Sequence, residues 1–130
     1  MAVGRGRVLR LATLIVVVQA GATHEVDAVL DSFLRRITPV RAEVVELYLY
    51  GSRSRGDHRP DSDYDVFVVL RERARPTVDA LYDAVVDVVC ETGSLISLKI
   101  VSRESFKESR AAGNSFVANV LHDGVPLALH

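Results

Sequence analysis

Residues 44–70 read VVELYLYGSRSRGDHRPDSDYDVFVVL, and this stretch decides the fold. Its two ends, 44–50 and 64–70, are short apolar runs rich in β-branched and aromatic residues, which predicts two strands. A Gly-Ser turn, a short helix and a polar segment lie between them. The pattern therefore predicts a strand that leads into a glycine turn and a second strand that starts beside two aspartates.

Asp63 and Asp65 stand at the start of the second strand, two residues apart. Because side chains alternate between the two faces of a strand, both carboxylates are expected on one face, with α carbons roughly 6.5 to 7 Å apart. Like charges at that distance repel, and Mg²⁺ held by the pair together with substrate phosphates would neutralise them. For Asp-x-Asp taken alone, a solvated acidic pair is the alternative interpretation.

The turn before the aspartates has the residues of a phosphate site. Gly51 can adopt backbone angles closed to other residues, and Ser52 can cap a short helix whose free N–H groups attract an anion. Arg53 and Arg55 supply donors for phosphate oxygens, or else are solvated or paired with aspartates of the following loop. The order of strand, turn, carboxylates and strand favours a nucleotide and metal site.

The stretch from Gly51 to Asp65 resembles the signature of the polymerase-beta-like nucleotidyltransferases, especially the small stand-alone minimal nucleotidyltransferases that act as antitoxins. The resemblance extends more weakly from about His24 to Leu129. It implies an α/β (α+β) fold in which a small mixed β-sheet is flanked by helices. It also implies Mg²⁺-dependent transfer of a nucleoside monophosphate, with AMP from ATP favoured over other nucleoside triphosphates, and release of pyrophosphate.

Carried over to this chain, the resemblance assigns the triphosphate to Gly51 and Ser52. It assigns the metal to Asp63 and Asp65, which would also be the catalytic residues. A third carboxylate is expected on a later strand.

That later strand is predicted over residues 94–101. Alternation there puts Ser97 and Lys99 on one face, and Ser97 stands where the family often has Asp. A serine is poorly suited, near neutral pH, to accept the proton of an attacking hydroxyl or to complete a metal shell. We therefore expect transfer to be weak or to need a partner's group. Lys99 either pairs with the aspartates, binds a phosphate or extends from a strand end into solvent.

The 130-residue chain has the composition of one soluble globular domain, with 48% hydrophobic and 25% charged residues. Its net charge of -1 and few aromatic residues do not support binding of long nucleic acid. A chain of this length has no room for an acceptor domain, so the acceptor is expected to be a separate protein. In the family this partner is often a HEPN-domain toxin, and the nucleotidyltransferase is its antitoxin.

Two other functions stay open. One is a catalytically weak or inactive relative that neutralises its partner by binding, which would suit Ser97. The other is a transferase for a small molecule such as an aminoglycoside, which usually has an added domain and is disfavoured by the chain length.

Residues 1–22 differ in character from the rest, because Arg5, Arg7 and Arg10 precede a short apolar run. The run is short for a transmembrane helix, so no membrane span is expected. A helix or strand of the folded protein, or an over-extended translation start, is favoured over a secretory signal, since a triphosphate site belongs in the cytoplasm. The nucleotidyltransferase domain is expected over residues 23–130.

Hydrophobic periodicity predicts the remaining elements. Helices are expected over residues 24–37 and 77–92, and a further helical region breaks at Gly113 and ends at Gly124. The core stripe of the second helix is predicted to be Leu81, Val85, Val88 and Val89. Cys90, in the same helix, is expected to be buried as a small hydrophobe.

Overall fold

The computed structural model describes the backbone of residues 2–3, 6–11, 14–19, 22–24, 27–56, 59 and 62–129, and the side chains of these ranges from residue 27 onward.

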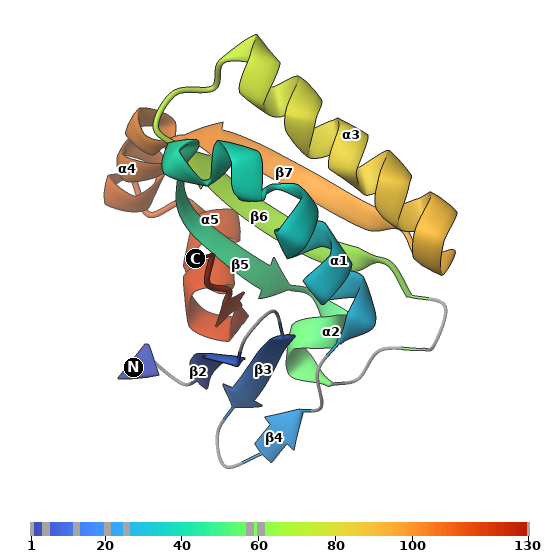
Figure 1. The fold of residues 1–130 in the computed structure, drawn as a ribbon. Coiled ribbons are helices and arrows are strands. Elements are labelled where there is room, and N and C mark those ends of the chain that lie inside the picture. The colour runs from blue at the N-terminus through green and yellow to red at the C-terminus, as the bar shows by residue number, and fades with distance from the viewer. Residues whose placement is uncertain are drawn as a thin grey trace.

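Four strands build the central sheet, in the spatial order β7-β6-β5-β8 (Figure 1). Strand β6 (Tyr64–Leu70) lies inside the sheet, antiparallel to β5 (Val44–Tyr50) and parallel to β7 (Ile96–Ser102). The two-residue strand β8 (Val125–Pro126) pairs with β5. This mixed sheet confirms the predicted fold class, and β5 and β6 have the bounds that the sequence predicted.

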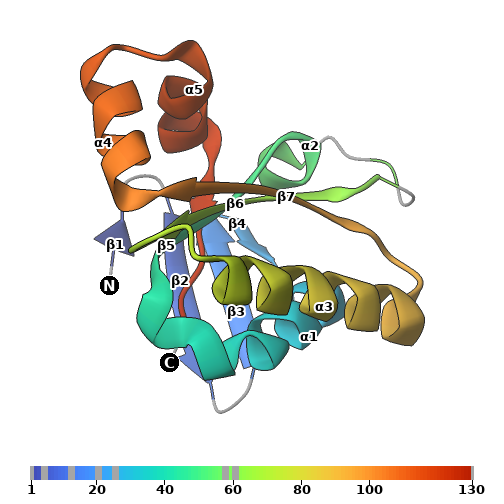
Figure 2. The ribbon, with the colours of Figure 1, turned by 90° about the horizontal axis from the view of Figure 1, so that it is seen from above.

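Helices cover both faces of the sheet (Figure 2). Helices α1 (Ala28–Arg36) and α3 (Arg75–Thr92) pack on one face, and α4 (Arg103–Ala111) and α5 (Ser115–Asp123) on the other. A 3₁₀ helix over Thr38–Glu43 leads into β5, and the short helix α2 (Ser52–Arg55) leaves it. Helix α3 supplies the crossover that the parallel pairing of β6 with β7 requires.

The side chains of β6 serve two hydrophobic cores. Val66, Val68 and Leu70 belong to the core beneath α1 and α3, whereas Phe67 and Val69 belong to the core beneath α4 and α5. All five are fully buried. A strand that is buried on both faces reads as a continuous apolar run, which explains the unbroken VFVVL of the sequence.

Side-chain caps set the starts of α1, α4 and α5; at α4, Ser102 Oγ accepts a hydrogen bond from the N–H of Ser105 at 3.0 Å. Asp27 Oδ1 accepts hydrogen bonds from the N–H groups of Val29 and Leu30, at 2.9 and 3.0 Å, and so caps α1. Asn114 Oδ1 accepts from the N–H of Val117 at 3.1 Å and caps α5. The break between α4 and α5 therefore falls at Gly113 and Asn114, as the sequence predicted.

Helix α3 differs from its prediction at two positions. Its buried face is made by Thr77, Leu81, Ala84, Val85 and Val88. Val89, which was expected in the core stripe, is 38% exposed, and Cys90 is exposed rather than buried. Each residue turns the helix by 100°, so Val89 and Cys90 rotate away from the face that Val88 buries. Apolar residues on more than one side of α3 made its periodicity ambiguous.

The N-terminal segment forms a second sheet, antiparallel and in the order β1-β2-β3-β4. Its strands are β1 (Ala2–Val3), β2 (Gly6–Leu11), β3 (Leu14–Gln19) and β4 (Ala22–His24). The described part of the apolar run is thus strand, which is one of the expected states. In the part of the chain that the structure describes, no helix is both long and apolar enough to cross a membrane. The division at residue 22 stays a prediction.

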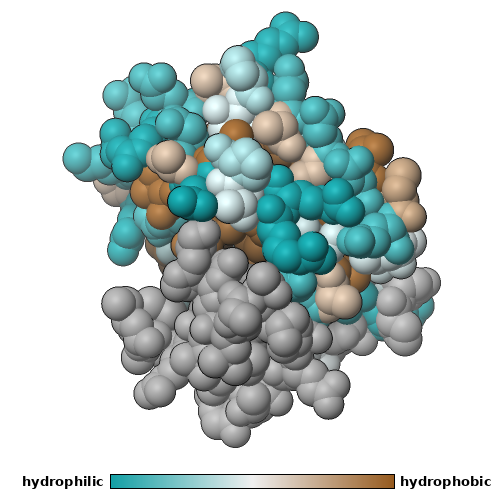
Figure 3. Space-filling model, viewed as in Figure 1, coloured by the Kyte–Doolittle hydropathy of each residue, from teal (hydrophilic) through white to brown (hydrophobic). Residues whose placement is uncertain are grey.

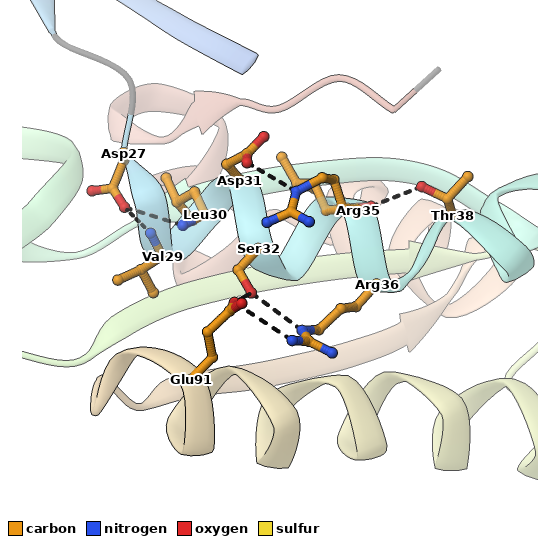
Figure 4. A network of polar contacts seen from close by, with 10 residues as sticks. Asp27, Val29, Leu30, Asp31, Ser32, Arg35, Arg36, Thr38 and Glu91 are labelled. Carbon is orange, nitrogen blue, oxygen red and sulfur yellow. Dashed lines mark hydrogen bonds and ion pairs between the residues drawn. The ribbon is translucent and has the colours of Figure 1, made fainter. Parts of the chain in front are cut away.

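A polar network joins α1 to α3 (Figure 4). Ser32 Oγ donates to the carboxylate of Glu91 and accepts from Arg36 Nε at 3.2 Å. Arg36 also pairs with Glu91 at 3.5 Å and with Asp87 at 3.7 Å. The hydrogen bond from Ser32, aided by the charge of Arg36, lowers the pKa of Glu91. The network therefore favours the ionised form of this glutamate in the folded protein.

Replacing Glu91 by Gln should reduce the acid sensitivity of the fold. The pKa of Glu91 is lower in the folded protein than in the unfolded chain. Glu91 therefore adds to the stability of the fold at pH values above its pKa in the unfolded chain, and this stability is lost as the pH falls through its pKa in the folded protein. Melting followed by circular dichroism at about pH 6 and about pH 4 tests this. We expect Glu91→Gln to melt about 2 °C lower than wild type at the higher pH. Between the two pH values, its melting temperature should fall less than that of the wild type.

The exposed Glu72 provides the matched control, and Glu72→Gln should follow the wild type at both pH values. An identical loss of melting temperature in wild type and Glu91→Gln would show that the network makes no pH-dependent contribution.

Candidate active site

The pairing of β5 with β6 brings the glycine turn against a carboxylate. The antiparallel register sets Tyr50 opposite Asp65, so Gly51 follows at the same end of the sheet. A Cβ built on Gly51 would lie 2.5 Å from Asp65 Oδ2. Gly51 also has φ 75° and ψ -156°, a region that essentially only glycine adopts. Both its backbone angles and its neighbour therefore require glycine at this position.

The two aspartates influence one another. Asp65 is partly buried, and Asp63 is exposed just before β6 begins. Burial raises the pKa of Asp65, and the negative charge of Asp63 raises it further. The carboxylates are thus near one another, in agreement with their spacing in the sequence.

Strand β7 sets Ser97 beside Asp65. In the parallel register Asp65 pairs with Ser97, and Phe67 pairs with Lys99. Paired residues of neighbouring strands project to the same face of a sheet, so Ser97 and Lys99 share the face of Asp65. Both are exposed, and none of the ion pairs among the described side chains includes Lys99. Of the three roles considered for Lys99, direct pairing with the aspartates is therefore not observed.

Arg53 holds the segment that carries Asp63. Its Nε and Nη2 atoms donate to the carbonyl oxygen of Ser62 at 3.0 and 2.9 Å. Its guanidinium carbon lies 3.8 Å from the centroid of the Tyr64 ring. A two-pronged hydrogen bond and stacking together fix the guanidinium plane. These contacts make Arg53 a positioning residue for Asp63, and its role in phosphate binding stays a prediction.

Tyr64 connects this network to helix α1. Its hydroxyl donates to Asp27 Oδ2 at 2.8 Å, while the other oxygen of Asp27 caps the helix. Burial, followed by the hydrogen bond to Asp27, raises the pKa of Tyr64, so the hydroxyl remains a donor at neutral pH. One aspartate thus caps a helix and anchors the strand that carries Asp65. Sequence reasoning missed this pair, because the two residues are distant in the chain.

The short helix after the turn differs in detail from its prediction. Gly51, and not Ser52, occupies the capping position of α2, and no side chain makes a capping bond there. The prediction that Ser52 caps the helix is therefore wrong, and Ser52 is its first residue. The buried Ser54 was not singled out from the sequence, yet its Oγ donates to the carbonyl of Gly51 at 2.8 Å and stabilises the turn. Arg55 is exposed.

Two aromatic rings lie beside the carboxylates. Tyr50 is directly opposite Asp65, and its ring meets that of Phe116 edge-on, with centroids 5.4 Å apart at 88°. Burial raises the pKa of Tyr50, and the charge of Asp65 adds to the effect. Phe116 comes from α5, and Figure 2 shows α2 on the same side of the sheet as α5. The candidate site therefore lies on the face of the sheet that carries α4 and α5.

Comparison with known families agrees with this geometry. A family model described as a nucleotidyltransferase domain matches residues 26–112. The chain belongs to this nucleotidyltransferase family. The matched residues include the glycine turn, both aspartates and all of β7, whereas α5 lies beyond them. Among curated proteins, none matches the chain.

Nucleotidyltransferases typically use a divalent cation, and the carboxylates of this domain fit one. Burial and the charge of Asp63 both raise the pKa of Asp65, so a cation beside the pair would favour the ionised form of Asp65. Carboxylate oxygens are ligands that Mg²⁺ prefers. The described residues contain no group of three His, Cys, Asp or Glu side chains placed to hold a metal. Two carboxylates and the oxygens of a ligand would therefore have to form the coordination shell.

Replacing Gly51 by Ala should impair nucleotide binding by this nucleotidyltransferase. The added Cβ must displace the Asp65 carboxylate, so we expect affinity for Mg²⁺ and ATP to fall at least about tenfold, measured by calorimetry on protein shown to be folded. Gly56→Ala is the control, because Gly56 also has a positive φ, 79°, but its Cβ would meet nothing within 4 Å. Equal losses in the two variants would contradict the role given to the Gly51–Asp65 contact.

Replacing Tyr64 by Phe should destabilise the nucleotidyltransferase, because the ring stays buried while Asp27 loses its donor. We expect a loss of about 1 kcal/mol in the free energy of unfolding, measured in urea. Tyr82→Phe removes a hydroxyl from an exposed ring and should have little effect. If both variants unfold like the wild type, the Tyr64–Asp27 bond does not anchor β6.

Proposed function

We propose that this nucleotidyltransferase transfers a nucleoside monophosphate, AMP from ATP, to a partner protein with the aid of Mg²⁺. The observation that carries the proposal is the contact of the Asp65 carboxylate with the Gly51 turn, beside Asp63. Membership of the family supports nucleotidyl transfer in general. The carboxylates would hold the cation and the glycine turn would hold the phosphate, and Gly51 and Asp65 lie together at one end of the sheet.

Each residue of the site then has a role. Asp63 and Asp65 would hold Mg²⁺, and Gly51 and Ser52 would hold the triphosphate through backbone N–H groups and the serine hydroxyl. The bound cation would neutralise charge on the phosphate oxygens. Arg55, which is exposed on α2, would donate to a phosphate oxygen. An acceptor oxygen attacks the α-phosphorus, the bond to the bridging oxygen breaks, and pyrophosphate leaves.

In this proposal, removal of the proton from the acceptor hydroxyl limits the rate of transfer. Ser97 holds the position on β7 that pairs with Asp65, where a carboxylate would be the natural base. A neutral serine hydroxyl accepts a proton poorly near neutral pH. We therefore infer that transfer by the domain alone is slow, or that the acceptor protein supplies the base.

The acceptor in this proposal is a HEPN-domain protein, with the nucleotidyltransferase acting as its antitoxin in the cytoplasm. The support is the resemblance of the stretch from Gly51 to Asp65 to minimal nucleotidyltransferases, whose partners are often of this kind. Neutralisation of the partner by binding alone is the second candidate function. The exposed Ser97 beside Asp65 favours it, because the lack of a third carboxylate would impair transfer more than it would impair binding of a cation and nucleotide.

Incubation with α-labelled ATP, Mg²⁺ and a candidate HEPN-domain partner protein separates the two functions. Transfer predicts label on the partner, and Asp63→Asn and Asp65→Asn should each reduce it at least about a hundredfold. Glu72→Gln, at an exposed acid outside the site, should label the partner like the wild type. A stable complex without label would support binding alone, and undiminished label with Asp65→Asn would contradict the assigned site.

Ser97→Asp should accelerate transfer, because it places a carboxylate beside Asp65. We expect an increase of about tenfold or more in the rate of labelling under single-turnover conditions. Lys99→Asp, two residues along the same face, is the positional control and should not accelerate the reaction. Rapid wild-type transfer that Ser97→Asp leaves unchanged would show that the missing carboxylate does not limit the rate.

A further inference from the structure

Helix α3 exposes a stripe of apolar side chains. Tyr82, Val86 and Val89 are 46%, 60% and 38% exposed. They are spaced four and three residues apart, so they form one row on the helix surface, here called the α3 stripe. Figure 3 shows brown, hydrophobic surface along the outer edge of α3, with teal surface around it.

The α3 stripe is separate from the face that α3 uses for folding. Leu81, Val85 and Val88 already bury the inner face of the helix against the sheet. The fold therefore does not need Val86 and its neighbours to be apolar. A helix with apolar residues on two sides is typical of one that packs against two partners.

Acidic side chains border the α3 stripe. They recur every fourth residue, as Asp79, Asp83, Asp87 and Glu91. Asp79 and Asp83 each come three residues before a member of the stripe and are therefore its neighbours on the surface. Asp87 and Glu91 pair with Arg36 of α1. Both Asp79 and Asp83 are exposed, and Asp79 forms a solvent-exposed ion pair with Arg75 at 3.9 Å, so the stripe has an acidic border on its solvent side.

Occupants from this chain fit the stripe poorly. Figure 1 shows α1 between α3 and the strands β2–β4, so the N-terminal sheet lies away from the stripe. Two copies that packed their α3 helices antiparallel across a two-fold axis would bring both acidic rows to the same side of the contact. Like charges brought together at an interface disfavour it.

We propose that the α3 stripe is a docking surface for an amphipathic helix of a partner protein whose apolar face is flanked by Lys or Arg. The apolar face would cover Tyr82, Val86 and Val89, and the basic residues would lie against Asp79 and Asp83. The surface lies on the opposite side of the sheet from the candidate active site. A partner bound there leaves that site open, so the inference goes beyond nucleotidyl transfer and does not depend on it.

Two synthetic helical peptides of about 18 residues test the proposal, each with a leucine stripe. One has Lys beside the leucines, and the other has Glu at the same positions. We expect the Lys peptide to bind at least about tenfold more tightly by fluorescence anisotropy. Val86→Gln should weaken its binding about tenfold, and combined Asp79→Lys and Asp83→Lys should reverse the preference.

Val45→Gln is the matched control, because Val45 is also an exposed valine but lies on β5, away from α3, and its replacement should leave binding unchanged. Equal binding of the two peptides, or binding that Val86→Gln does not weaken, overturns the proposal. So does a dimer in sedimentation velocity that Val86→Gln dissociates, since the stripe would then belong to a second copy of this chain.

Discussion

The contact between the Asp65 carboxylate and the backbone of Gly51 is the constraint on which the candidate site depends. The register of β5 and β6 leaves no space for a side chain at residue 51 while Asp65 stays in place. Residue 51 therefore has to be glycine. Because the glycine turn lies directly against the Asp65 carboxylate, a side chain added at residue 51 would displace that carboxylate.

The surrounding fold keeps this contact in position. Strand β6 is buried on both faces, by α1 and α3 on one side and by α4 and α5 on the other, so the carboxylate at its start is attached to the most enclosed element of the sheet. Arg53 and Tyr64 extend that support to the exposed segment before the strand, through Ser62 and Asp27. A site supported in this way would need little reordering to bind the proposed cation and nucleotide.

The sequence predicted the elements with a clear period and missed what depends on distant contacts. Strands β5 and β6 were predictable from their apolar runs, whereas Cys90 and Val89 were misplaced because α3 is apolar on two sides. That second apolar side is the α3 stripe. Alternation put Ser97 on the face opposite Ile96, but only the register of β6 with β7 sets it beside Asp65. The bond from Tyr64 to Asp27 joins segments whose proximity no local pattern reveals.

The central claim is that Asp63, Asp65 and the Gly51 turn together form a site for Mg²⁺ and a nucleoside triphosphate. A crystal structure of the protein with Mg²⁺ and a non-hydrolysable ATP analogue tests it most directly. The account predicts a cation bound by both carboxylates and by phosphate oxygens, with the triphosphate against residues 51–52. A nucleotide bound elsewhere on the protein would contradict it. So would a triphosphate bound at the turn with no cation at either aspartate.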